Sequence, residues 1–171
     1  MKYLIIIDMQ KDFVTGALGS DEARRIIPAV EAKAADSSYD KVFYTFDTHY
    51  DDYMDTLEGK KLPVPHCIRG TDGWNSVLSS VRGELIEKNT FGYDGWFEKL
   101  GKLGRGDSID IIGVCTDICV VSNALILRAL YPDTPIAADA SCCAGTSVTA
   151  HKAALTVMKS CQIDIINEQG E

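Results

Sequence analysis

One cysteine of the chain stands where a nucleophile could be activated. Cys119 follows an apolar run over residues 108–114, and a helical pattern over residues 117–130 would place it in a first helical turn. Thr116 or Asp117 could cap this helix. The free backbone N–H groups and the positive end of a helix dipole lower the pKa of a thiol and can stabilise an oxyanion. A buried core cysteine fits the local sequence equally well, so Cys119 is a candidate nucleophile that needs partners.

Two charged residues at the ends of apolar runs could be those partners. Asp8 closes the run over residues 3–7. A carboxylate that burial removes from water has a raised pKa, which suits a general base. Lys88 follows a shorter run over residues 83–87. Taken alone, the first residue also fits a turn-capping aspartate and the second a solvated surface lysine.

A third set of residues has the composition of a metal site. Asp47 and His49, followed by His66, offer one carboxylate and two imidazoles, which divalent transition metals accept. Glu58 lies between the two histidines and could supply a fourth ligand. The acidic residues that could compete with it are Asp51, Asp52 and Asp55. The alternative is a pair of surface-loop histidines with no ligand role.

Elements of two kinds alternate along the chain. Apolar runs of strand length lie at residues 3–7, 41–46, 83–87, 108–114, 135–138 and 163–166. Helical patterns lie at residues 21–35, 74–81, 95–103, 117–130 and 146–161. Several apolar runs are continuous, as in parallel strands covered on both faces. The alternation predicts an α/β fold, a three-layer α/β/α Rossmann-like domain with a mainly parallel sheet of about six strands. We expect residues 1–171 to form this single domain.

The predicted sheet explains how the candidate residues could meet. In parallel α/β sheets the functional site lies at the carboxyl ends of the strands. Asp8, Lys88 and the segments 47–49 and 114–117 all follow strand ends, so we expect them on one rim.

Three further features of the sequence bear on the predicted elements and on the site. Pro28 falls inside the helical pattern over residues 21–35 and should kink or delay that helix. Residues 48–73 are predicted to form a long loop, and loops of this length inside compact domains are usually functional. His151 lies in the last helical pattern, away from the rim, and is expected to be structural.

Composition excludes several classes of partner. The formal net charge of -8 repels phosphate backbones and anionic membrane surfaces, so neither nucleic acid nor a membrane is expected as a partner. The first apolar run ends at Asp8, which is too short for a signal peptide, and no stretch reaches the ~18 apolar residues of a membrane span. The six cysteines lack Cys-x-x-Cys spacing, and most of them fit free buried thiols. We therefore expect a cytoplasmic protein.

Taken together, these segments resemble the isochorismatase-like cysteine hydrolases, especially their nicotinamidase branch, over nearly the whole chain. Residues 8–13 (DMQKDF) are similar to the opening family element D-x-Q-x-D-F, whose first aspartate is the catalytic acid/base. Lys88 resembles the catalytic lysine. Residues 113–120 (GVCTDICV) are similar to G-V-x-T-D-x-C-V, in which the second cysteine is the nucleophile. The resemblance implies a triad of Asp8, Lys88 and Cys119.

The same resemblance implies a backbone arrangement and a reaction. It implies a cis peptide bond between Val114 and Cys115, and an oxyanion hole made by the backbone N–H groups of Cys115 and Cys119. Asp8 would take the proton of the Cys119 thiol, and Lys88 would favour the ionised forms. Water, activated by Asp8 or by the metal, would resolve the resulting thioester.

The resemblance also implies a divalent metal. Nicotinamidases hold it through D-x-H and a later H-C dipeptide, which Asp47, His49 and His66 match. Some members add a glutamate, for which Glu58 lies near the right place. The metal would be zinc in the first place, with manganese or iron as alternatives. Isochorismatases proper generally lack the second histidine, so His66 favours the nicotinamidase branch.

One position departs from the branch. Nicotinamidases often carry an aromatic residue three positions before the second histidine, which packs on the pyridine ring of the substrate, and here this position is Pro63. Phe13 is retained and is expected to bind substrate. Tyr93, Trp96 or Phe97 could replace the missing aromatic wall.

The expected activity is hydrolysis of a small primary carboxamide, nicotinamide to nicotinate and ammonia, through a Cys119 thioester. The alternatives are another small amide, a carbamoyl compound or a vinyl ether on the same triad, or a non-enzymatic binding domain on the same fold. Family resemblance further implies a homo-oligomer, a dimer or tetramer.

Overall fold

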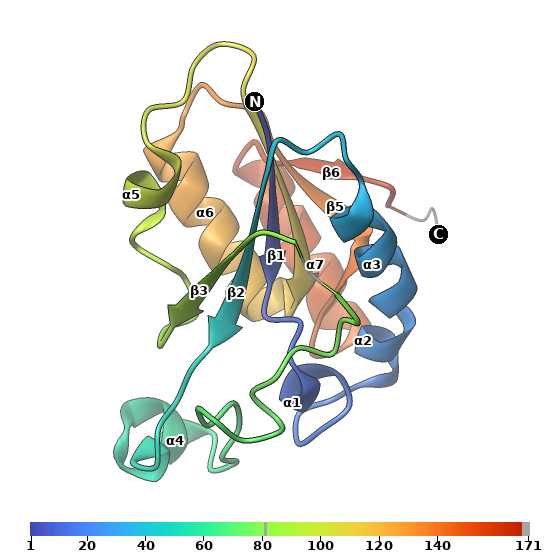
Figure 1. Ribbon diagram of the computed structural model, residues 1–171. Coiled ribbons are helices and arrows are strands. Elements are labelled where there is room, and N and C mark those ends of the chain that lie inside the picture. The colour runs from blue at the N-terminus through green and yellow to red at the C-terminus, as the bar shows by residue number, and fades with distance from the viewer. Residues whose placement is uncertain (81, 169–171) are drawn as a thin grey trace.

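The computed structural model describes residues 1–80 and 82–168, and its centre is a parallel sheet (Figure 1). The strand order among the described residues is β3-β2-β1-β4-β5-β6, with every neighbouring pair parallel. The strands are β1 (Lys2–Ile7), β2 (Lys41–Asp47), β3 (Glu84–Lys88), β4 (Ser108–Val114), β5 (Ile136–Ala144) and β6 (Asp164–Ile166). The predicted α/β fold with a mainly parallel sheet of about six strands is thereby confirmed.

Helices cover both faces of the sheet and create two separate cores. On β1, Ile5 and Ile7 belong to the core under the later helices, whereas Leu4 and Ile6 belong to the core under the earlier ones. The earlier helices are α1 (Lys11–Val14), α2 (Asp21–Arg25) and α3 (Ile27–Ala35). The later helices are α5 (Trp96–Leu100), α6 (Val121–Leu130) and α7 (Val148–Ser160). Successive side chains of a strand point to opposite faces, so a continuous apolar run serves both layers.

The helical pattern over residues 21–35 becomes two helices. Ser20 caps α2, where its hydroxyl oxygen accepts a hydrogen bond from the Ala23 N–H at 3.0 Å. The helix is interrupted at Ile26, and Pro28 lies in the first turn of α3. Proline lacks an N–H and is tolerated in a first turn, where that donor has no partner within the helix. The proline therefore starts a second helix instead of kinking one long helix.

The predicted helix over residues 74–81 is wrong for residues 74–80, and Val81 lies outside the described residues. This segment forms turns and a bridge between Ser76 and Gln10. The Lys11 N–H donates to the Asn75 carbonyl at 2.9 Å, and the Val77 N–H donates to the Met9 carbonyl at 2.9 Å. Its backbone groups are thus used by residues 9–11 and not by a helical ladder.

The predicted loop over residues 48–73 contains two short helices that lie beyond the carboxyl ends of β2 and β3 (Figure 1). They are the 3-10 turn η1 (Tyr53–Asp55) and α4 (Leu57–Lys61). Thr56 caps α4, because its side-chain oxygen accepts from the Gly59 N–H at 3.0 Å. Tyr53 is buried and anchors the segment.

Smaller differences concern element lengths. β5 continues to Ala144, well past the predicted end at residue 138, after a register shift against β4. The helices predicted at residues 95–103 and 146–161 are shorter, as α5 and α7. None of the helices formed by residues 1–80 and 82–168 is both long and apolar enough to cross a membrane.

Glycine is required at the end of β4. Gly113 has φ +119°, and a Cβ there would lie 2.1 Å from the Ile7 carbonyl oxygen. This close approach joins β4 to β1 directly before the cis peptide bond between Val114 and Cys115, which the resemblance implied and which is present. The two strand ends that carry Asp8 and Cys119 are therefore held side by side.

Candidate active site

Four strand ends bring together the residues that the sequence singled out. Asp8 directly follows β1, Asp47 ends β2 and Lys88 ends β3. Cys119 lies in η2 (Thr116–Val120), a π-helical turn between β4 and α6. All four side chains are buried. The expected rim at the carboxyl end of the sheet is confirmed by these positions.

Asp8 is a fully buried carboxylate held by the neighbouring strand. Its backbone has φ 48°, in the left-handed region, which turns the chain at the end of β1. The Thr45 hydroxyl donates to Asp8 Oδ1 at 2.6 Å, and the Asp8 N–H donates to the Thr45 carbonyl at 3.1 Å. Burial raises the pKa of Asp8, although the nearby Lys88 acts in the opposite direction. The buried carboxylate is therefore a stronger base than an exposed one.

Lys88 is a buried ammonium at the centre of the group. Its Nζ lies 2.7 Å from Asp8 Oδ2, 3.5 Å from Asp47 Oδ1 and 3.7 Å from Cys119 Sγ. Burial lowers the pKa of Lys88, but the negative charges around it outweigh burial and raise the pKa above its ordinary value. The lysine thus stays charged, and its field favours negative charge on the carboxylates and the sulfur.

The Cys119 thiol does not have the lowered pKa that a helix N-terminus would give. Burial raises its pKa well above the ordinary value, and the charge of Asp8 adds to this effect, while Lys88 opposes it. The expected capping is also wrong. Cys115 occupies the cap position without a side-chain hydrogen bond, and Asp117 instead accepts from the N–H and hydroxyl of Thr146 at 2.8 and 2.6 Å. The resting thiol is therefore protonated and depends on a base.

His151 lies closer to this turn than expected. Its Nδ1 is 2.8 Å from the hydroxyl oxygen of Thr116, a fully buried residue at the start of η2. Burial lowers the pKa of His151. The α7 helix therefore contacts the turn that carries Cys119, and His151 supports that turn from behind.

Beside the lysine, four donor atoms from Asp47, His49, Glu58 and His66 lie within 4.8 Å of one another. His49 Nε2 is 3.1 Å from Asp47 Oδ2, and His66 Nε2 is 3.7 Å from Glu58 Oε1. The Val64 carbonyl lies 2.8 Å from His66 Nδ1 and accepts a hydrogen bond from its N–H. This leaves the Nε2 lone pair directed at the carboxylates, the arrangement that metal-binding histidines need.

Two imidazoles and two carboxylates fit a divalent cation of the zinc, manganese or iron type. The charges of the group interact strongly. Burial raises the pKa of Asp47, but His49 and Lys88 outweigh burial and lower the pKa below its ordinary value. Burial and the charge of Asp47 raise the pKa of Glu58. The exposed residues that competed with Glu58 in the sequence, Asp51, Asp52 and Asp55, are not part of this group.

The two histidine segments are joined by backbone pairing. The His49 N–H donates to the Cys67 carbonyl at 3.0 Å, and the Arg69 N–H donates to the His49 carbonyl at 2.9 Å. The buried ring of Tyr53 packs edge-on against both imidazoles, with centroid distances of 4.8 Å to His49 and 5.1 Å to His66. The long segment after β2 therefore folds back to place both imidazoles over the sheet.

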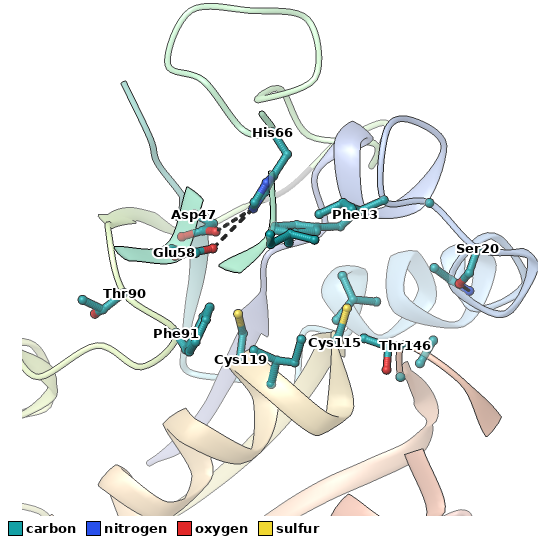
Figure 2. Close-up of a pocket in the computed structure, with 18 of the residues that line it drawn as sticks. Phe13, Ser20, Asp47, Glu58, His66, Thr90, Phe91, Cys115, Cys119 and Thr146 are labelled. Carbon is teal, nitrogen blue, oxygen red and sulfur yellow. Dashed lines mark hydrogen bonds and ion pairs between the residues drawn. The ribbon is translucent and has the colours of Figure 1, made fainter. Parts of the chain in front are cut away.

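A cavity of 680 Å³ opens above these residues. Figure 2 shows His66, Asp47 and Glu58 at one end above Cys119, and Phe13 above Cys115 further along. The ring of Phe13 lies 5.3 Å from that of His66. Asp8 and Lys88 do not line the cavity and lie beneath it, behind Cys119. The cavity thus presents the thiol, the metal-type ligands and one aromatic face to a small molecule.

Many residues that line the cavity were not predicted from the sequence. The expected aromatic replacements Tyr93, Trp96 and Phe97 do not line the cavity, and neither does Pro63. The lining residues not expected from the sequence are Leu18, Gly19, Ser20, Ala23, Leu57, Lys61, Leu62, Asn89, Thr90, Phe91, Ile118, Ala144, Gly145 and Thr146. The cap at Thr56 was a usable signal for α4, which supplies several of them.

Known proteins are similar to this chain in sequence and in fold. A sequence profile of the isochorismatase domain matches residues 2–169. The chain is 30% identical over 195 aligned residues to the nicotinamidase/pyrazinamidase of Mycobacterium tuberculosis, covering 97% of this chain and 98% of that protein. The structure of a pyrazinamidase/nicotinamidase from Streptococcus mutans is similar with a TM-score of 0.79 and 26% identity, covering 97% of this chain and 100% of that chain.

The fold is also that of the pyrazinamidase of Pyrococcus horikoshii, solved in complex with zinc, with a TM-score of 0.77, 24% identity, and coverage of 98% of this chain and 99% of that chain. The family profile spans nearly the whole chain, and the fold agrees with that of the similar solved structures. The protein therefore belongs to the isochorismatase family.

Proposed function

We propose that the protein is an amidase that hydrolyses nicotinamide to nicotinate and ammonia through a thioester on Cys119. The observation that carries this proposal is the position of Lys88 Nζ, 2.7 Å from Asp8 Oδ2 and 3.7 Å from Cys119 Sγ, beneath a cavity of small-molecule size. The 30% identity to a nicotinamidase/pyrazinamidase over almost the full length of both chains supports the substrate class.

The first half of the reaction forms the thioester. As the Cys119 sulfur attacks the carbonyl carbon, its proton moves to the Asp8 carboxylate, which burial makes a stronger base than an exposed one. The ammonium of Lys88 stabilises the charge on the sulfur during this transfer. The tetrahedral intermediate then breaks its C–N bond, Asp8 returns the proton to the departing nitrogen, and ammonia leaves.

The second half returns the enzyme to its starting state. Water enters the position that ammonia has left, and Asp8 removes one of its protons as the oxygen attacks the thioester carbon. The C–S bond breaks, the thiolate takes up the proton from Asp8, and the carboxylic acid is released. Asp8 therefore serves as base and acid in turn. Its buried position next to the charged Lys88 allows both roles.

The oxyanion of both tetrahedral intermediates would be bound by the backbone N–H groups of Cys115 and Cys119. Both residues line the cavity, on the turn that follows the cis peptide bond (Figure 2). The Cys115 carbonyl accepts from the N–H groups of Ile118 and Val120, both at 3.1 Å, which fixes the turn. Fixed donors stabilise developing charge without reorganisation during the reaction.

Asp47, His49, Glu58 and His66 would hold a divalent metal, zinc in the first place. When bound, such a metal supplies a Lewis-acid contact for a ring nitrogen of the substrate. Phe13 would pack on the ring, since it lines the cavity beside His66. These contacts orient the carboxamide toward Cys119.

We also propose a domain organisation, a cellular location and an oligomeric state for the enzyme. We take residues 1–171 to act as a single domain, in a cytoplasmic homo-oligomer, a dimer or tetramer, that binds neither nucleic acid nor membranes. The formal charge of -8 supports the exclusion of nucleic acid and of anionic membranes.

Ammonia release from nicotinamide and pyrazinamide tests the proposed activity. We expect Cys119→Ala to lower kcat/KM by at least about a thousandfold, because the covalent route is lost. The matched control is Cys161→Ala, which removes a thiol outside the cavity and should change kcat/KM by less than about threefold. A Cys119→Ala protein with more than about a tenth of the activity would contradict the thioester route.

A further inference from the structure

The cavity is longer than the reacting groups require. A volume of 680 Å³ has room for on the order of 20 water molecules at about 30 Å³ each, more than a single aromatic ring with one carboxamide displaces. The metal-type ligands and Cys119 occupy one end. In Figure 2 the cavity continues past Cys115 to Thr146 and Ser20. This second part, the distal arm, is formed by Leu18, Ser20, Ala23, Ala144, Gly145 and Thr146.

Both polar side chains of the distal arm, those of Ser20 and Thr146, form hydrogen bonds within the protein. The Ser20 hydroxyl oxygen accepts from the Ala23 N–H at 3.0 Å as the cap of α2. The Thr146 N–H and hydroxyl both donate to Asp117, at 2.8 and 2.6 Å. The Leu18, Ala23 and Ala144 side chains then leave an apolar surface. A ligand group in the arm gains from burial and finds few free polar partners.

Charge is confined to the other part of the cavity. The charged residues among its lining are Asp47, Glu58 and Lys61, and they come from β2 and α4, whereas the distal arm is built from the α1–α2 connection, α2 and the end of β5. A carboxylate in the arm would meet no cation among the residues of the arm and would lie near Asp117, which accepts from Thr146.

We propose that the distal arm binds an apolar extension of the substrate. The preferred substrates are then aromatic ring carboxamides with an alkyl substituent or a fused second ring, of which nicotinamide is the unsubstituted parent. This inference rests on the proposed function. Because ammonia is the leaving group there, the extension belongs to the acyl part and remains on the acid product.

A substrate series tests the arm in the native enzyme. The series consists of nicotinamide, its methyl, ethyl and propyl derivatives at each ring carbon, quinoline-3-carboxamide, and ring derivatives that carry a carboxylate. For the ring position that faces the arm, we expect kcat/KM to rise by about fourfold for each added methylene and the carboxylate derivatives to be poorer than nicotinamide. If nicotinamide is hydrolysed and every extended amide is slower, the arm does not have this role.

Filling the arm gives the second test. Ala23→Leu should lower kcat/KM for the propyl and quinoline substrates by at least about tenfold and change that for nicotinamide by less than about threefold. Leu18→Phe, at a half-buried position of the same arm, repeats the test if Ala23→Leu folds poorly. The matched control is Ala32→Leu on an exposed position of α3, outside the cavity. Equal losses on short and extended substrates would overturn the proposal.

Binding separates this inference from the proposed reaction. Titration calorimetry on Cys119→Ala measures affinity for the intact amides without turnover. The extended amides should bind more tightly than nicotinamide, and Ala23→Leu in the same background should remove the difference. If no amide is hydrolysed by the native enzyme, the proposed function fails, and the distal arm is still decided by these affinities. Equal affinities for nicotinamide and the extended amides would overturn the distal arm alone.

Discussion

Lys88 is a buried ammonium that lies near two carboxylates, those of Asp8 and Asp47, and near the Cys119 thiol. The distances of 2.7 Å to Asp8 and 3.5 Å to Asp47 make it the shared counter-ion of the proposed acid/base and of the metal-type group. A buried charge is tolerated only where opposite charge compensates its lost hydration. The residue therefore couples catalysis and stability, and both can be measured in one substitution.

Replacement of Lys88 by methionine keeps the length of the side chain and removes its charge. We expect the free energy of unfolding to fall by about 3 kcal/mol, because Asp8 and Asp47 are left buried without their cation. Amidase activity should fall by at least about a hundredfold, because the sulfur loses its nearest positive charge. Urea unfolding and ammonia release measure the two effects.

The control for this substitution is Lys61→Met, which makes the same change at an exposed position of the cavity wall. It should shift the free energy of unfolding by less than about 0.5 kcal/mol. Equal stability of the two variants would show that Lys88 does not compensate the buried carboxylates.

How far single residues could be predicted depended on where they lie. Asp8 and Lys88 lie at the ends of apolar runs that were readable in the sequence as parallel strands, so their meeting point was predictable. Phe91 and Leu62 line the cavity from irregular segments whose course is set by tertiary contacts. No local pattern encodes such contacts, so the cavity wall could not be predicted.

At the scale of elements, Gln10 connects three segments of the site. Its side-chain Nε2 donates to the carbonyls of Asp47 and Trp74, at 2.9 and 3.0 Å, and its Oε1 accepts from the Asp47 N–H at 2.7 Å. Gln10 is fully buried, so these bonds replace water for three backbone groups. The end of β2, where the metal-type group begins, is thereby tied to the segment after β1 and to the turn at residue 74.

Gln10→Leu removes these bonds while keeping the approximate volume. We expect the free energy of unfolding to fall by about 3 kcal/mol, since three buried backbone groups lose their partner. The affinity for zinc, measured by titration of the metal-free protein, should fall by about tenfold because Asp47 is no longer held at the strand end. Asn75→Ala, which removes an exposed amide that bonds the Thr71 carbonyl, should change neither quantity. Unchanged zinc affinity in Gln10→Leu would show that Asp47 is positioned without the amide.

The errors at this scale have a common physical cause. Residues 74–80 carry a helical pattern, but their backbone groups bond to residues 9–11, far away in the sequence. Conversely, residues 57–61 form a helix inside a predicted loop because Thr56 caps it and the buried Tyr53 anchors it. Short elements are decided by such contacts and not by propensity. Long periodic elements, such as β1 and β4, were predicted closely.

At the scale of the whole molecule, a polar network joins the α3 layer to the sheet. Lys33 Nζ lies 2.5 Å from Asp139 Oδ2 and 3.7 Å from Asp110 Oδ2. Asp139 Oδ1 also accepts from the N–H and hydroxyl of Ser141, and Asp139 Oδ2 accepts from the Asn167 side chain at 3.0 Å. Lys33, Asp110 and Asp139 do not line the cavity, so the network reports on the stability of the layered fold itself.

This network should make stability depend on pH. Burial raises the pKa of Asp139, but Lys33, Ser141 and Asn167 outweigh burial and lower the pKa below its ordinary value. Because the folded pKa is lower than the unfolded one, the stabilisation is fully present above the ordinary carboxyl pKa of about 3.9 and is lost as the pH falls through the folded value.

Asp139→Asn, which removes the charge and keeps the shape, should therefore lower the free energy of unfolding by about 2 to 4 kcal/mol at pH 7, and the gap to the native protein should narrow below about pH 4. Urea unfolding of both proteins between about pH 3 and 7 measures the gap. Asp133→Asn, on an exposed turn, should show almost no gap at any pH. A gap for Asp139→Asn that stays constant into acid would mean that the amide costs stability because its NH2 group cannot accept the hydrogen bonds of the carboxylate, and that the charge of Asp139 does not hold α3 to the sheet.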